Sequence, residues 1–328
     1  MKLAVVGATG MVGCEILAVL QERNFVYSEL ILVASKKSVG IKKIINNKTV
    51  LISSLEEMLV LKPDLALFSA GSEVSKKWAP KLAEQGCKVI DNSSYWRMCS
   101  KHKLIIPEIN GNQLKQEDMI VANPNCSTIQ LLLAIAPIHY KYKIKRIVVS
   151  TYQAVTGTGK KALDQLNNEE QEVAGVRAYP HPIYRNILPH IDDFEENRYT
   201  KEEMKIVNET HKILDKDILI TATTVRVPVE RGHCESVNLR LSEDFETKEI
   251  VNILNNSEGV VVFDNIEKNK YPMPINVSGS DDVYVGRIRR DFSEEKSLNM
   301  WVAADNLRKG AATNTVQIAE YMINNKLI

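Results

Sequence analysis

The sequence lacks an apolar run long enough to cross a bilayer, which needs roughly 20 consecutive apolar residues. Of its 328 residues, 44% are hydrophobic and 25% are charged, as in an ordinary globular protein. The chain begins with the strand-like stretch KLAVVG, which does not have the architecture of a secretory signal peptide. We therefore expect a soluble, cytoplasmic protein without a membrane partner.

The sequence also lacks an excess of either charge, because 42 Lys and Arg residues against 41 Asp and Glu residues leave a formal net charge of +1. That balance gives no electrostatic basis for a nucleic-acid partner. The cysteines are odd in number and have no CxxC spacing, so they predict neither a disulfide framework nor a metal site. They are Cys14, Cys87, Cys99, Cys126 and Cys234. What remains is a reduced, enzyme-sized chain of two domains, or of one large α/β domain with an insertion.

The first feature that is present is a strand, a glycine turn and a helix, in KLAVVGATGMVGCEILAVLQER. The N-terminus of such a helix can hold a pyrophosphate, although the spacing here is GxxGxxG rather than GxGxxG. The alternative is a βα turn that uses glycine for geometry alone. The cofactor-binding residues predicted from this turn are Gly7, Thr9, Gly10, Met11, Val12 and Gly13.

The second predicted strand, ELILVAS, ends where an NAD enzyme carries an acid for the ribose 2′-hydroxyl. Here the residues at that point are Ser35, Lys36, Lys37 and Ser38. Two lysines and two hydroxyls suit a 2′-phosphate, so we predict NADP, held by Lys37 and Ser38 and with Lys36 close by. The alternative is that these lysines are simply solvated.

Strand-like stretches then alternate with helical ones through DLALFSA and CKVID, which predicts a doubly wound parallel sheet. The small residues of SAGS, 69–72, would let a cofactor lie close to the backbone at the carboxyl edge. Arg97, in NSSYWRM, is either an ordinary surface arginine or a bidentate clamp for an oxyanion.

A cysteine stands where an apolar helix begins, in VANPNCST followed by IQLLLAIAPI. Pro124 and Asn125 discourage helix before Cys126, so its thiol would face the unpaired N–H groups and the positive end of the helix dipole. Both favour thiolate over thiol. The alternative is that Cys126 is a small buried hydrophobe.

After this helix the period changes, and 144–155, 217–229, 234–241, 282–292 and 297–306 are predicted strands of a sheet with one wetter face. The stretches 159–175 and 200–215 are predicted helices, the second capped by Thr200 with Glu203. Glu202 and Lys205 share a face of that helix, where an exposed ion pair is the alternative to a functional site. Arg226 lies in a strand, and His233 follows the turn at Gly232, where a histidine is more often structural or solvated.

The order and spacing of eight motifs resemble those of the aspartate-β-semialdehyde dehydrogenase family over nearly the whole chain. They are GATGMVG, SAGS, SSYWRM, NPNCST, TYQAVTGTG, EEMK, VRVPVERGH and DNLRKGAA. The combination of NPNCST, TYQAVTGTG and VRVPVERGH is the most specific. One departure is Cys234, which follows His233 where serine is expected and complicates the assignment of a single reactive thiol.

The resemblance implies a Rossmann-like NADP-binding domain over 1–125, completed by the C-terminal helix 307–328. It further implies an α+β catalytic and dimerisation domain with a mixed sheet over 126–306, and a homodimer. The implied reaction is the NADPH-dependent reductive dephosphorylation of L-4-aspartyl phosphate to aspartate semialdehyde, on the pathway to lysine, threonine and methionine.

The resemblance also implies a role for each residue of the candidate site. Cys126 is the nucleophile that forms a thioester, His233 the general acid and base, and Gln153 the residue that orients the acyl oxygen. Arg226 would bind the substrate α-carboxylate and Glu202 its ammonium group. Arg97 and Lys205 would bind phosphate, and Thr156, Gly157 and Asn306 the nicotinamide half of the cofactor.

Three rivals remain open. The nearest is another acyl-thioester reductase of similar build, such as N-acetyl-glutamyl-phosphate reductase or a CoA-acylating semialdehyde dehydrogenase. Glu202 and Arg226 argue instead for a substrate with a free ammonium and a free carboxylate, which an N-acylated substrate lacks. A thiol hydrolase would leave the glycine turn and the two lysines without a role. A non-catalytic NADP-binding protein would not need the Cys, Gln, Arg and His set.

Overall fold

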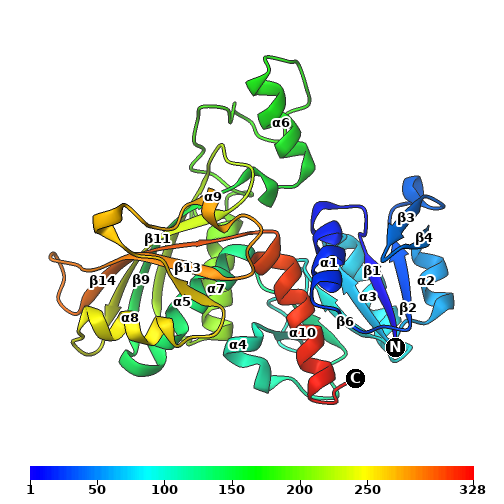
Figure 1. Ribbon diagram of the computed structural model, residues 1–328, viewed down its shortest axis with the longest axis horizontal. Helices are drawn as coiled ribbons and strands as arrows, with labels where there is room; N and C mark the ends of the chain where they lie inside the picture. The colour runs from blue at the N-terminus through cyan, green and yellow to red at the C-terminus, as the bar shows by residue number, and fades with distance from the viewer. The chain divides into compact units, whose positions relative to one another are not determined.

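The computed structural model describes residues 1–328, and the chain divides into two compact units (Figure 1). The first unit comprises Met1–Asn125 and Ala311–Ile328, and the second comprises Cys126–Gly310. The division therefore falls directly before Cys126, and each unit has a β-sheet of its own.

The first unit is built on an eight-stranded sheet with the order β3-β4-β2-β1-β5-β6-β8-β7. In that order the strands are Lys42–Ile45, Lys48–Ser53, Glu29–Val33, Lys2–Val6, Leu65–Phe68, Lys88–Asp91, Ile120–Ala122 and Lys103–Leu104. All neighbours are parallel except β3 and β4, which form an antiparallel hairpin. Its helices are α1 (Met11–Glu22), α2 (Leu55–Leu61), α3 (Ser72–Glu84), α4 (Pro107–Asn110) and α10 (Thr313–Asn324), with short 3-10 turns at Lys36–Ser38 and Gly111–Gln113.

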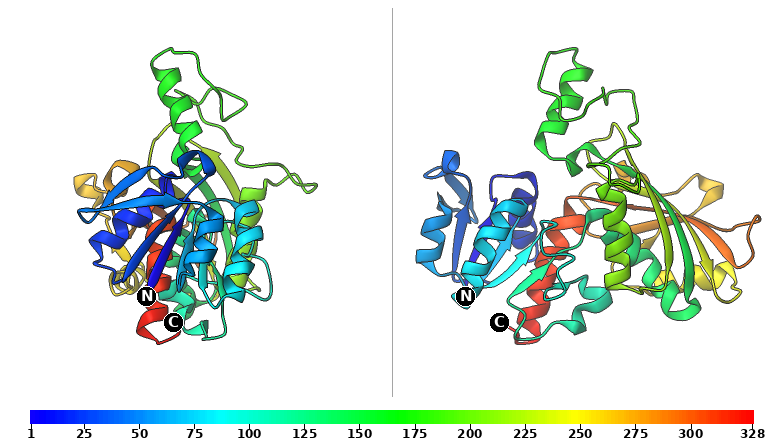
Figure 2. Two further views of the ribbon diagram at one scale, coloured as in Figure 1. Left: turned by 90° about the vertical axis from the view of Figure 1, so that its right-hand side faces the viewer. Right: turned by 180° about the vertical axis from the view of Figure 1, so that it is seen from behind.

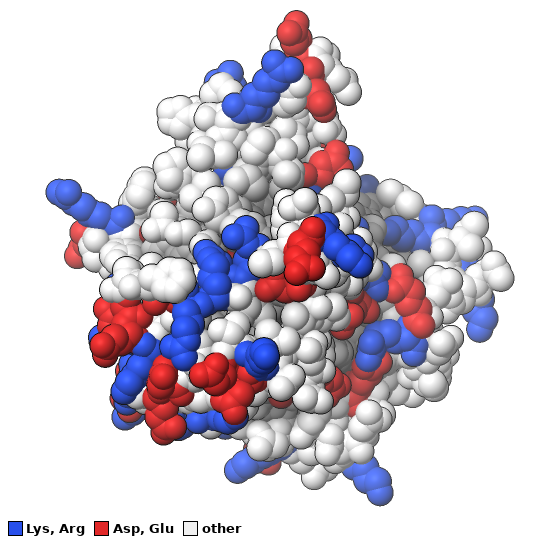
Figure 3. Space-filling model, turned by 60° about the vertical axis from the view of Figure 1, so that its left-hand side comes forward, with Lys and Arg blue, Asp and Glu red and all other residues white.

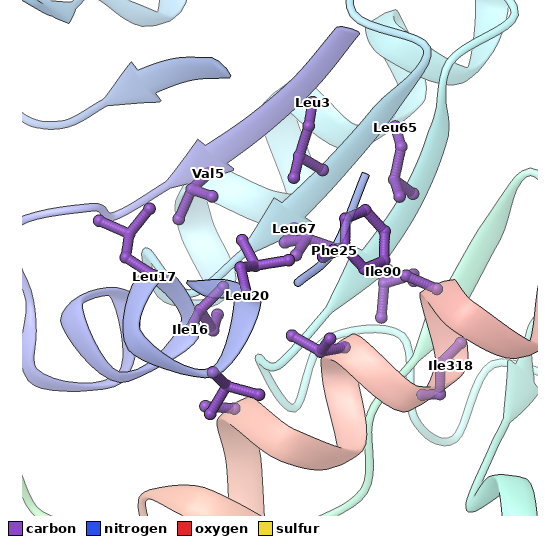
Figure 4. Close-up of a cluster of buried hydrophobic side chains, with 14 of the residues drawn as sticks. Leu3, Val5, Ile16, Leu17, Leu20, Phe25, Leu65, Leu67, Ile90 and Ile318 are labelled. Carbon is purple, nitrogen blue, oxygen red and sulfur yellow. The ribbon is translucent and has the colours of Figure 1, made fainter. Parts of the chain in front are cut away.

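The central strands of this sheet are buried on both faces, as expected for parallel strands covered by helices. Alternate residues of β1 enter different clusters, because successive side chains of a strand point to opposite faces. Leu3 and Val5 pack with α1 and α10 (Figure 4), whereas Ala4 and Val6 pack with α2 and α3. The fold is the doubly wound, Rossmann-like sheet that the sequence predicts, and the C-terminal helix is part of its core.

The second unit is built on a six-stranded mixed sheet with the order β10-β9-β11-β14-β13-β12. In that order the strands are Leu219–Arg226, Ile144–Gln153, His233–Leu241, Ser297–Ala304, Val283–Arg290 and Val260–Val262. β10 is parallel to β9 and β12 to β13, and the other neighbours are antiparallel. Its helices are α5 (Cys126–Tyr142), α6 (Lys160–Glu170), α7 (Lys201–Ile213), α8 (Thr247–Asn255) and α9 (Pro274–Val277), with short 3-10 turns at Val155–Gly157 and Ile266–Lys268. A π-helical turn, Arg308–Ala312, begins in this unit and ends in the returning segment of the first unit.

The two faces of the mixed sheet differ in what covers them. The apolar helix α5 packs across β9, β11, β13 and β14 on one face, and α7 and α8 pack beside α5. On the other face Tyr152 and Trp301 lie with ring centroids 5.3 Å apart, next to the buried Cys234. Side chains that alternate along β11 therefore point either to α5 or to this aromatic cluster.

Some element ends differ from the predictions for local reasons. The helix predicted to reach Gly175 ends at Glu170, and Glu172 has a left-handed backbone (φ 56°) that a helix does not accept. The strand predicted to reach Val229 ends at Arg226, before Pro228, which has no N–H to donate. The capping box of α7 is present, with Thr200 and Glu203 each accepting the other's backbone N–H.

No helix of the chain is both long enough and apolar enough to cross a membrane. On the face drawn in Figure 3, Lys and Arg side chains are interspersed with Asp and Glu side chains, as the near-zero net charge leads one to expect.

Candidate active site

Cys126 is the first residue of α5 and is partly exposed, so it is not the buried hydrophobe of the alternative interpretation. A β-carbon built on Gly310 would lie 2.8 Å from the Cys126 β-carbon, closer than real atoms approach. The backbone at Gly310 thus passes directly against the cysteine, and only glycine leaves it room.

Three candidate side chains lie in a row at the ends of three neighbouring strands of the mixed sheet. Arg226, the last residue of β10, is paired in register with Gln153, the last residue of β9. His233, the first residue of β11, completes the row, because Nδ1 of its ring accepts a hydrogen bond of 3.0 Å from the backbone N–H of Ala154. All three side chains of the row are at most 2% exposed.

His233 is held as a neutral imidazole. Burial, and after it the charge of Arg226, lowers its pKa to about 3, although Glu202 opposes the shift. Because Nδ1 accepts the Ala154 N–H, the proton of the neutral ring is on Nε2, which makes no hydrogen bond within the protein. Nε2 and the Arg226 Nη1 would lie 3.1 and 2.9 Å from a β-carbon on Gly157, so both border this glycine.

Arg226 is buried without a carboxylate partner. Its Nη1 donates a 2.6 Å hydrogen bond to the carbonyl of Ala154, and its Nε makes no hydrogen bond within the protein. The guanidinium carbon lies 5.8 Å from the centre of the Tyr179 ring, in the geometry of a cation–π contact. The charge of Arg226 is therefore oriented but not neutralised.

A chain of polar contacts connects Gln153 to α7. The Gln153 side-chain amide donates to Glu202 (3.1 Å), and Lys205 donates to both Glu202 (3.0 Å) and Asp192 (2.7 Å). Burial alone would lower the pKa of Lys205, but the two carboxylates raise it above its usual value. Glu202 is 5% exposed, so the exposed surface ion pair considered as an alternative is wrong. The Thr151 hydroxyl donates to the side-chain oxygen of Gln153 (3.0 Å).

Asn306 brings together the residues predicted to contact the nicotinamide half of the cofactor. Its side-chain N–H donates to the Thr156 hydroxyl (3.0 Å), and its side-chain oxygen accepts the backbone N–H of Gly232 (3.0 Å). Asn306 thus fastens the turn before His233 to the turn that contains Thr156 and Gly157.

The glycine turn belongs to the first unit and is closely packed. A β-carbon would lie 2.5 Å from the Ser69 carbonyl oxygen at Gly7, which has φ +89°, and 2.1 Å from the Gly7 oxygen at Gly13. Both positions therefore require glycine for packing alone. Thr9 and Gly10 follow in the same turn, and α1 starts at Met11 and Val12 with no acidic residue in its first turn, which keeps its N-terminus suited to an anion.

The turn after β2 carries the residues predicted to hold a 2′-phosphate. Lys36 and Lys37 are exposed and Ser38 is half-buried. The glycine turn lies beside this strand, because the backbone N–H groups of Gly7 and Ala8 both donate to the Val33 carbonyl.

Sequence reasoning missed Lys43, whose side chain reaches the glycine turn from β3. Its Nζ donates to the Ala8 carbonyl (2.9 Å) and contacts the Cys14 sulfur (3.2 Å). The signal that could have found it is compositional, since residues 30–55 hold five lysines and no acid. No carboxylate lies within ion-pair distance of Lys36, Lys37 or Lys43, so this part of the first unit carries uncompensated positive charge.

Arg97 also belongs to the first unit and is 8% exposed, so it is not an ordinary surface arginine. Its Nη2 donates a 2.7 Å hydrogen bond to the Asn92 carbonyl. The nearby Asp91 accepts a hydrogen bond from Ser93, and burial raises its pKa despite that bond and the Arg97 charge.

Comparison with known proteins identifies the family. Residues 2–117 match the family described as semialdehyde dehydrogenase, NAD binding domain, and residues 135–309 match semialdehyde dehydrogenase, dimerisation domain. The chain is 49% identical to the aspartate-semialdehyde dehydrogenase of Aquifex aeolicus, covering 100% of this chain and 99% of the relative. The chain belongs to the aspartate-semialdehyde dehydrogenase family.

Other members of the family support the same assignment. The aspartate-semialdehyde dehydrogenase of Legionella pneumophila is 47% identical, over 98% of this chain and 95% of that protein. The crystal structure of aspartate semialdehyde dehydrogenase II from Vibrio cholerae, complexed with ASA, matches with a TM-score of 0.94 at 42% identity and covers 98% of both chains. The resemblance inferred from the motifs is confirmed, and the protein is an oxidoreductase with a nicotinamide-cofactor domain.

Within the family pattern, the unexpected Cys234 lies on the opposite face of β11 from His233. It packs with Val277 and Ala303 in the cluster that faces away from α5. Burial raises the pKa of this thiol to about 12. Cys234 is therefore a protonated thiol at neutral pH, whereas Cys126 is partly exposed at the N-terminus of α5.

Proposed function

We propose that this protein catalyses the NADPH-dependent reductive dephosphorylation of L-4-aspartyl phosphate to L-aspartate 4-semialdehyde, with release of phosphate. The observation that carries the proposal is a partly exposed cysteine at a helix N-terminus, in one unit with a buried, neutral histidine and a buried, uncompensated arginine. Family membership and the Vibrio cholerae relative complexed with ASA support the substrate.

Cys126 would attack the acyl carbon of the substrate. The new C–S bond replaces the bond from the acyl carbon to the phosphate oxygen, and phosphate leaves with that electron pair. The N-terminus of α5 favours the thiolate that begins this step. NADPH, when bound, supplies the hydride that reduces the thioester carbon. Breaking the C–S bond then releases the aldehyde, and the sulfur takes up a proton.

His233 is the proposed general acid and base of these steps. Its hydrogen bonds impose a condition on that role. In the neutral ring Nδ1 is an acceptor and Nε2 carries the proton, so Nε2 can donate to a negatively charged sulfur or oxygen but cannot accept a proton. Nε2 can take the thiol proton only in the other neutral tautomer, in which the single ring proton is on Nδ1. In that tautomer Nδ1 no longer accepts the Ala154 N–H, so that hydrogen bond must break.

The substrate amino-acid group would be held by Arg226 and Glu202. The guanidinium offers two parallel N–H donors to the α-carboxylate, a geometry that lysine cannot reproduce. Glu202 is the proposed acceptor for the substrate ammonium and already accepts bonds from Gln153 and Lys205. Gln153 would then direct its second N–H towards the acyl oxygen.

Arg97 and Lys205 are the proposed phosphate-binding residues. Lys205 is held between Asp192 and Glu202, so phosphate would compete with the more exposed carboxylate, Asp192, for this ammonium. Arg97 keeps its guanidinium in place through the Asn92 carbonyl.

We propose NADP(H) rather than NAD(H) as the cofactor. The glycine turn and the acid-free first turn of α1 suit the pyrophosphate, and the loop after β2 presents Lys36, Lys37 and Ser38 without an acid for a ribose hydroxyl. Lys43 adds a third ammonium group beside the turn. Thr156, Gly157 and Asn306 are the proposed contacts of the nicotinamide half.

The proposed assembly is a homodimer in the cytoplasm, acting in lysine, threonine and methionine biosynthesis. The match of residues 135–309 to a dimerisation domain supports the homodimer.

The test is to incubate the protein with aspartate semialdehyde, phosphate and NADP+ while NADPH absorbance is followed. We expect NADPH to form only when all three are present. A preference for an N-acylated substrate, or a requirement for CoA, would indicate one of the related reductases. Phosphate release without a change in NADPH would indicate a thiol hydrolase, and cofactor binding without turnover would indicate a non-catalytic protein.

A further inference from the structure

The helix α6 and the segment after it project from the mixed sheet of the second unit (Figures 1 and 2). The projection has a small apolar cluster of its own, in which Leu166 and Ile183 are buried and Tyr179 is half-buried. None of the proposed catalytic or binding residues lies in the projection, so its contribution to the site has to come from what it places beside the sheet.

Two side chains of α6 hold the returning segment at a fixed position. The side-chain oxygen of Gln165 accepts the backbone N–H groups of Ala178 (2.6 Å) and Tyr179 (2.9 Å). One carboxylate oxygen of Glu169 accepts those of Ile183 (2.7 Å) and Tyr184 (2.9 Å).

These two anchors are also fastened to each other. The Gln165 amide donates to the other Glu169 oxygen (2.7 Å) and to the His181 carbonyl (3.2 Å). Gln165 is 2% exposed, so its side chain is itself held in a fixed position inside the projection. The segment from 178 to 184 is therefore positioned by α6 rather than left as a loose loop.

The position fixed in this way places the Tyr179 ring against the Arg226 guanidinium, 5.8 Å from ring centre to guanidinium carbon. The phenol donates a 3.0 Å hydrogen bond to the hydroxyl of Thr158, the residue after Gly157. Tyr179 thus reaches from the turn at Gly157 to Arg226, beside the glycine that Arg226 and His233 both border.

An aromatic ring is a neighbour of a particular kind for a binding arginine. A carboxylate in the same place would orient the guanidinium but would neutralise it and occupy its N–H donors. A ring face restricts the guanidinium without using those donors, so they stay available to an anion. The only hydrogen bond of the Arg226 side chain within the protein runs from Nη1 to the Ala154 carbonyl.

We propose that Tyr179 is a positioning residue for substrate specificity, whose ring holds the Arg226 guanidinium in the orientation that accepts the α-carboxylate. The projection built on α6 then serves to present this ring to the site. The inference rests on the proposed function, because it requires Arg226 to bind the substrate carboxylate.

The experiment compares Tyr179→Leu, Tyr179→Phe and the wild type with two aldehydes, aspartate semialdehyde and 3-aminopropanal, which lacks the α-carboxylate. The kcat/KM for each is measured by NADPH formation in the presence of phosphate. For Tyr179→Leu we expect a fall of about fivefold or more with aspartate semialdehyde, mainly through KM, and less than about twofold with 3-aminopropanal. Tyr179→Phe keeps the ring and should stay close to the wild type.

Tyr184→Leu is the matched control. Tyr184 belongs to the same segment and cluster, but its ring lies on Arg185, 5.1 Å away, rather than on Arg226. We expect it to leave the preference between the two aldehydes unchanged. Gln165→Leu loosens the Tyr179 backbone without touching the ring, and should reduce the preference in the same direction as Tyr179→Leu but less.

Equal losses with the two aldehydes in Tyr179→Leu would show that the residue supports only the fold, and an unchanged kcat/KM would show that the ring is not needed. Both results overturn the inference. Arg226→Lys is measured in parallel to separate this from a failure of the proposed function. If Arg226→Lys loses the preference and Tyr179→Leu keeps it, Arg226 binds the carboxylate without help from Tyr179. If the wild type itself shows no preference, the proposed role of Arg226 is wrong.

Discussion

The two units hold their candidate functional groups in different ways. In the first unit the cofactor loop is made of backbone at the end of a parallel strand, and its main requirement is the absence of side chains at Gly7 and Gly13. In the second unit the candidate groups are side chains at the ends of three neighbouring strands, Gln153, Arg226 and His233. Local sequence is enough to specify a backbone loop, whereas a row of side chains depends on strand register.

The difference predicts where a substitution separates binding from chemistry. Changes in the first unit should alter cofactor affinity and leave the chemistry of a bound substrate nearly intact. Changes in the row of the second unit should impair the reaction of the substrate and leave cofactor affinity nearly intact. The following predictions test that division, beginning with the largest expected effect.

Cys126→Ala should lower turnover by about three orders of magnitude or more, because the thioester route is lost when the nucleophile is removed. NADPH binding, measured by fluorescence titration, should remain within about twofold of the wild type, since Cys126 is not among the proposed cofactor contacts. Cys234→Ser is the matched control and should stay near wild-type activity, because this buried thiol faces away from α5. Activity of Cys126→Ala within about tenfold of the wild type would show that Cys126 is not the nucleophile.

Arg226→Lys should lower kcat/KM for aspartate semialdehyde by at least about tenfold, because lysine keeps the charge but loses the two parallel donors. The loss should shrink with 3-aminopropanal, and the melting temperature should change little. If a calorimetric scan instead shows a large drop in melting temperature and both aldehydes lose equally, Arg226 serves the structure of the row rather than substrate binding.

The same contrast explains which parts of the structure could be predicted from the sequence alone. The strands β1, β2, β5 and β6 are short apolar runs followed by turn residues, and these runs predict the parallel sheet. The motifs predict the family. The start of α5 at Cys126 was also visible locally, because Pro124 and Asn125 precede it. The adjacency of His233 to Ala154 was not, because it depends on how β9 and β11 pair across 79 residues of chain.

Other features were missed because their local signals are weak. β7 has two residues and β8 and β12 have three, too few to show a period. Lys43 lies in β3, a four-residue strand without buried positions, so its contact with the glycine turn had no pattern to predict it. The anchoring of Tyr179 by Gln165 likewise joins residues that show no motif.

A third prediction tests the first unit. Replacing both Lys36 and Lys37 by alanine should weaken NADPH binding by about tenfold and NADH binding by less than about twofold, because only NADPH carries the 2′-phosphate. Isothermal titration with each cofactor measures the two affinities. An unchanged ratio of the two affinities would refute the assignment of these lysines to the phosphate.

Lys43→Ala extends the same measurement to the residue that the sequence did not indicate. If its ammonium contributes to the 2′-phosphate site, NADPH binding should weaken more than NADH binding, by about threefold to tenfold. Lys42→Ala is the control, since Lys42 is its exposed neighbour on β3. Equal weakening of both cofactors by Lys43→Ala would mean that the bond to the Ala8 carbonyl only braces the glycine turn.

The smallest expected effect on activity belongs to a prediction about stability, which concerns the completely buried side chain of Glu235. It lies two residues after His233 on the face of β11 that α5 covers, opposite Thr151 in register. Burial raises the pKa of this carboxyl well above its usual value, and the amide of Gln130, one turn after Cys126 on α5, only partly opposes the shift. The folded protein therefore keeps Glu235 neutral at a pH where the unfolded chain has already ionised it.

The sign of the pH dependence follows from that difference. Below about pH 4 both states bind the proton and Glu235 has no influence on the pH dependence. As the pH rises from there towards the raised pKa of the folded state, the unfolded chain loses the proton first, so unfolding becomes more favourable. The cost is at most about 1.4 kcal/mol per pH unit for one proton. Glutamine has nearly the same shape and does not titrate, so Glu235→Gln should remove this cost.

Thermal melts of the wild type and Glu235→Gln between pH 4 and pH 8 measure the effect. We expect the melting temperature of the variant to gain on the wild type as the pH rises, and the two to differ least at pH 4. Glu249→Gln supplies a contrast of opposite sign, because a hydrogen bond from Tyr142 lowers the pKa of that exposed carboxyl and its contribution is lost as the pH falls. A constant difference between Glu235→Gln and the wild type at every pH would mean that Glu235 is ionised in the folded protein. A negative charge would then lie beside Gln130, one helical turn after Cys126 on α5, where it would oppose the thiolate that the proposed chemistry requires.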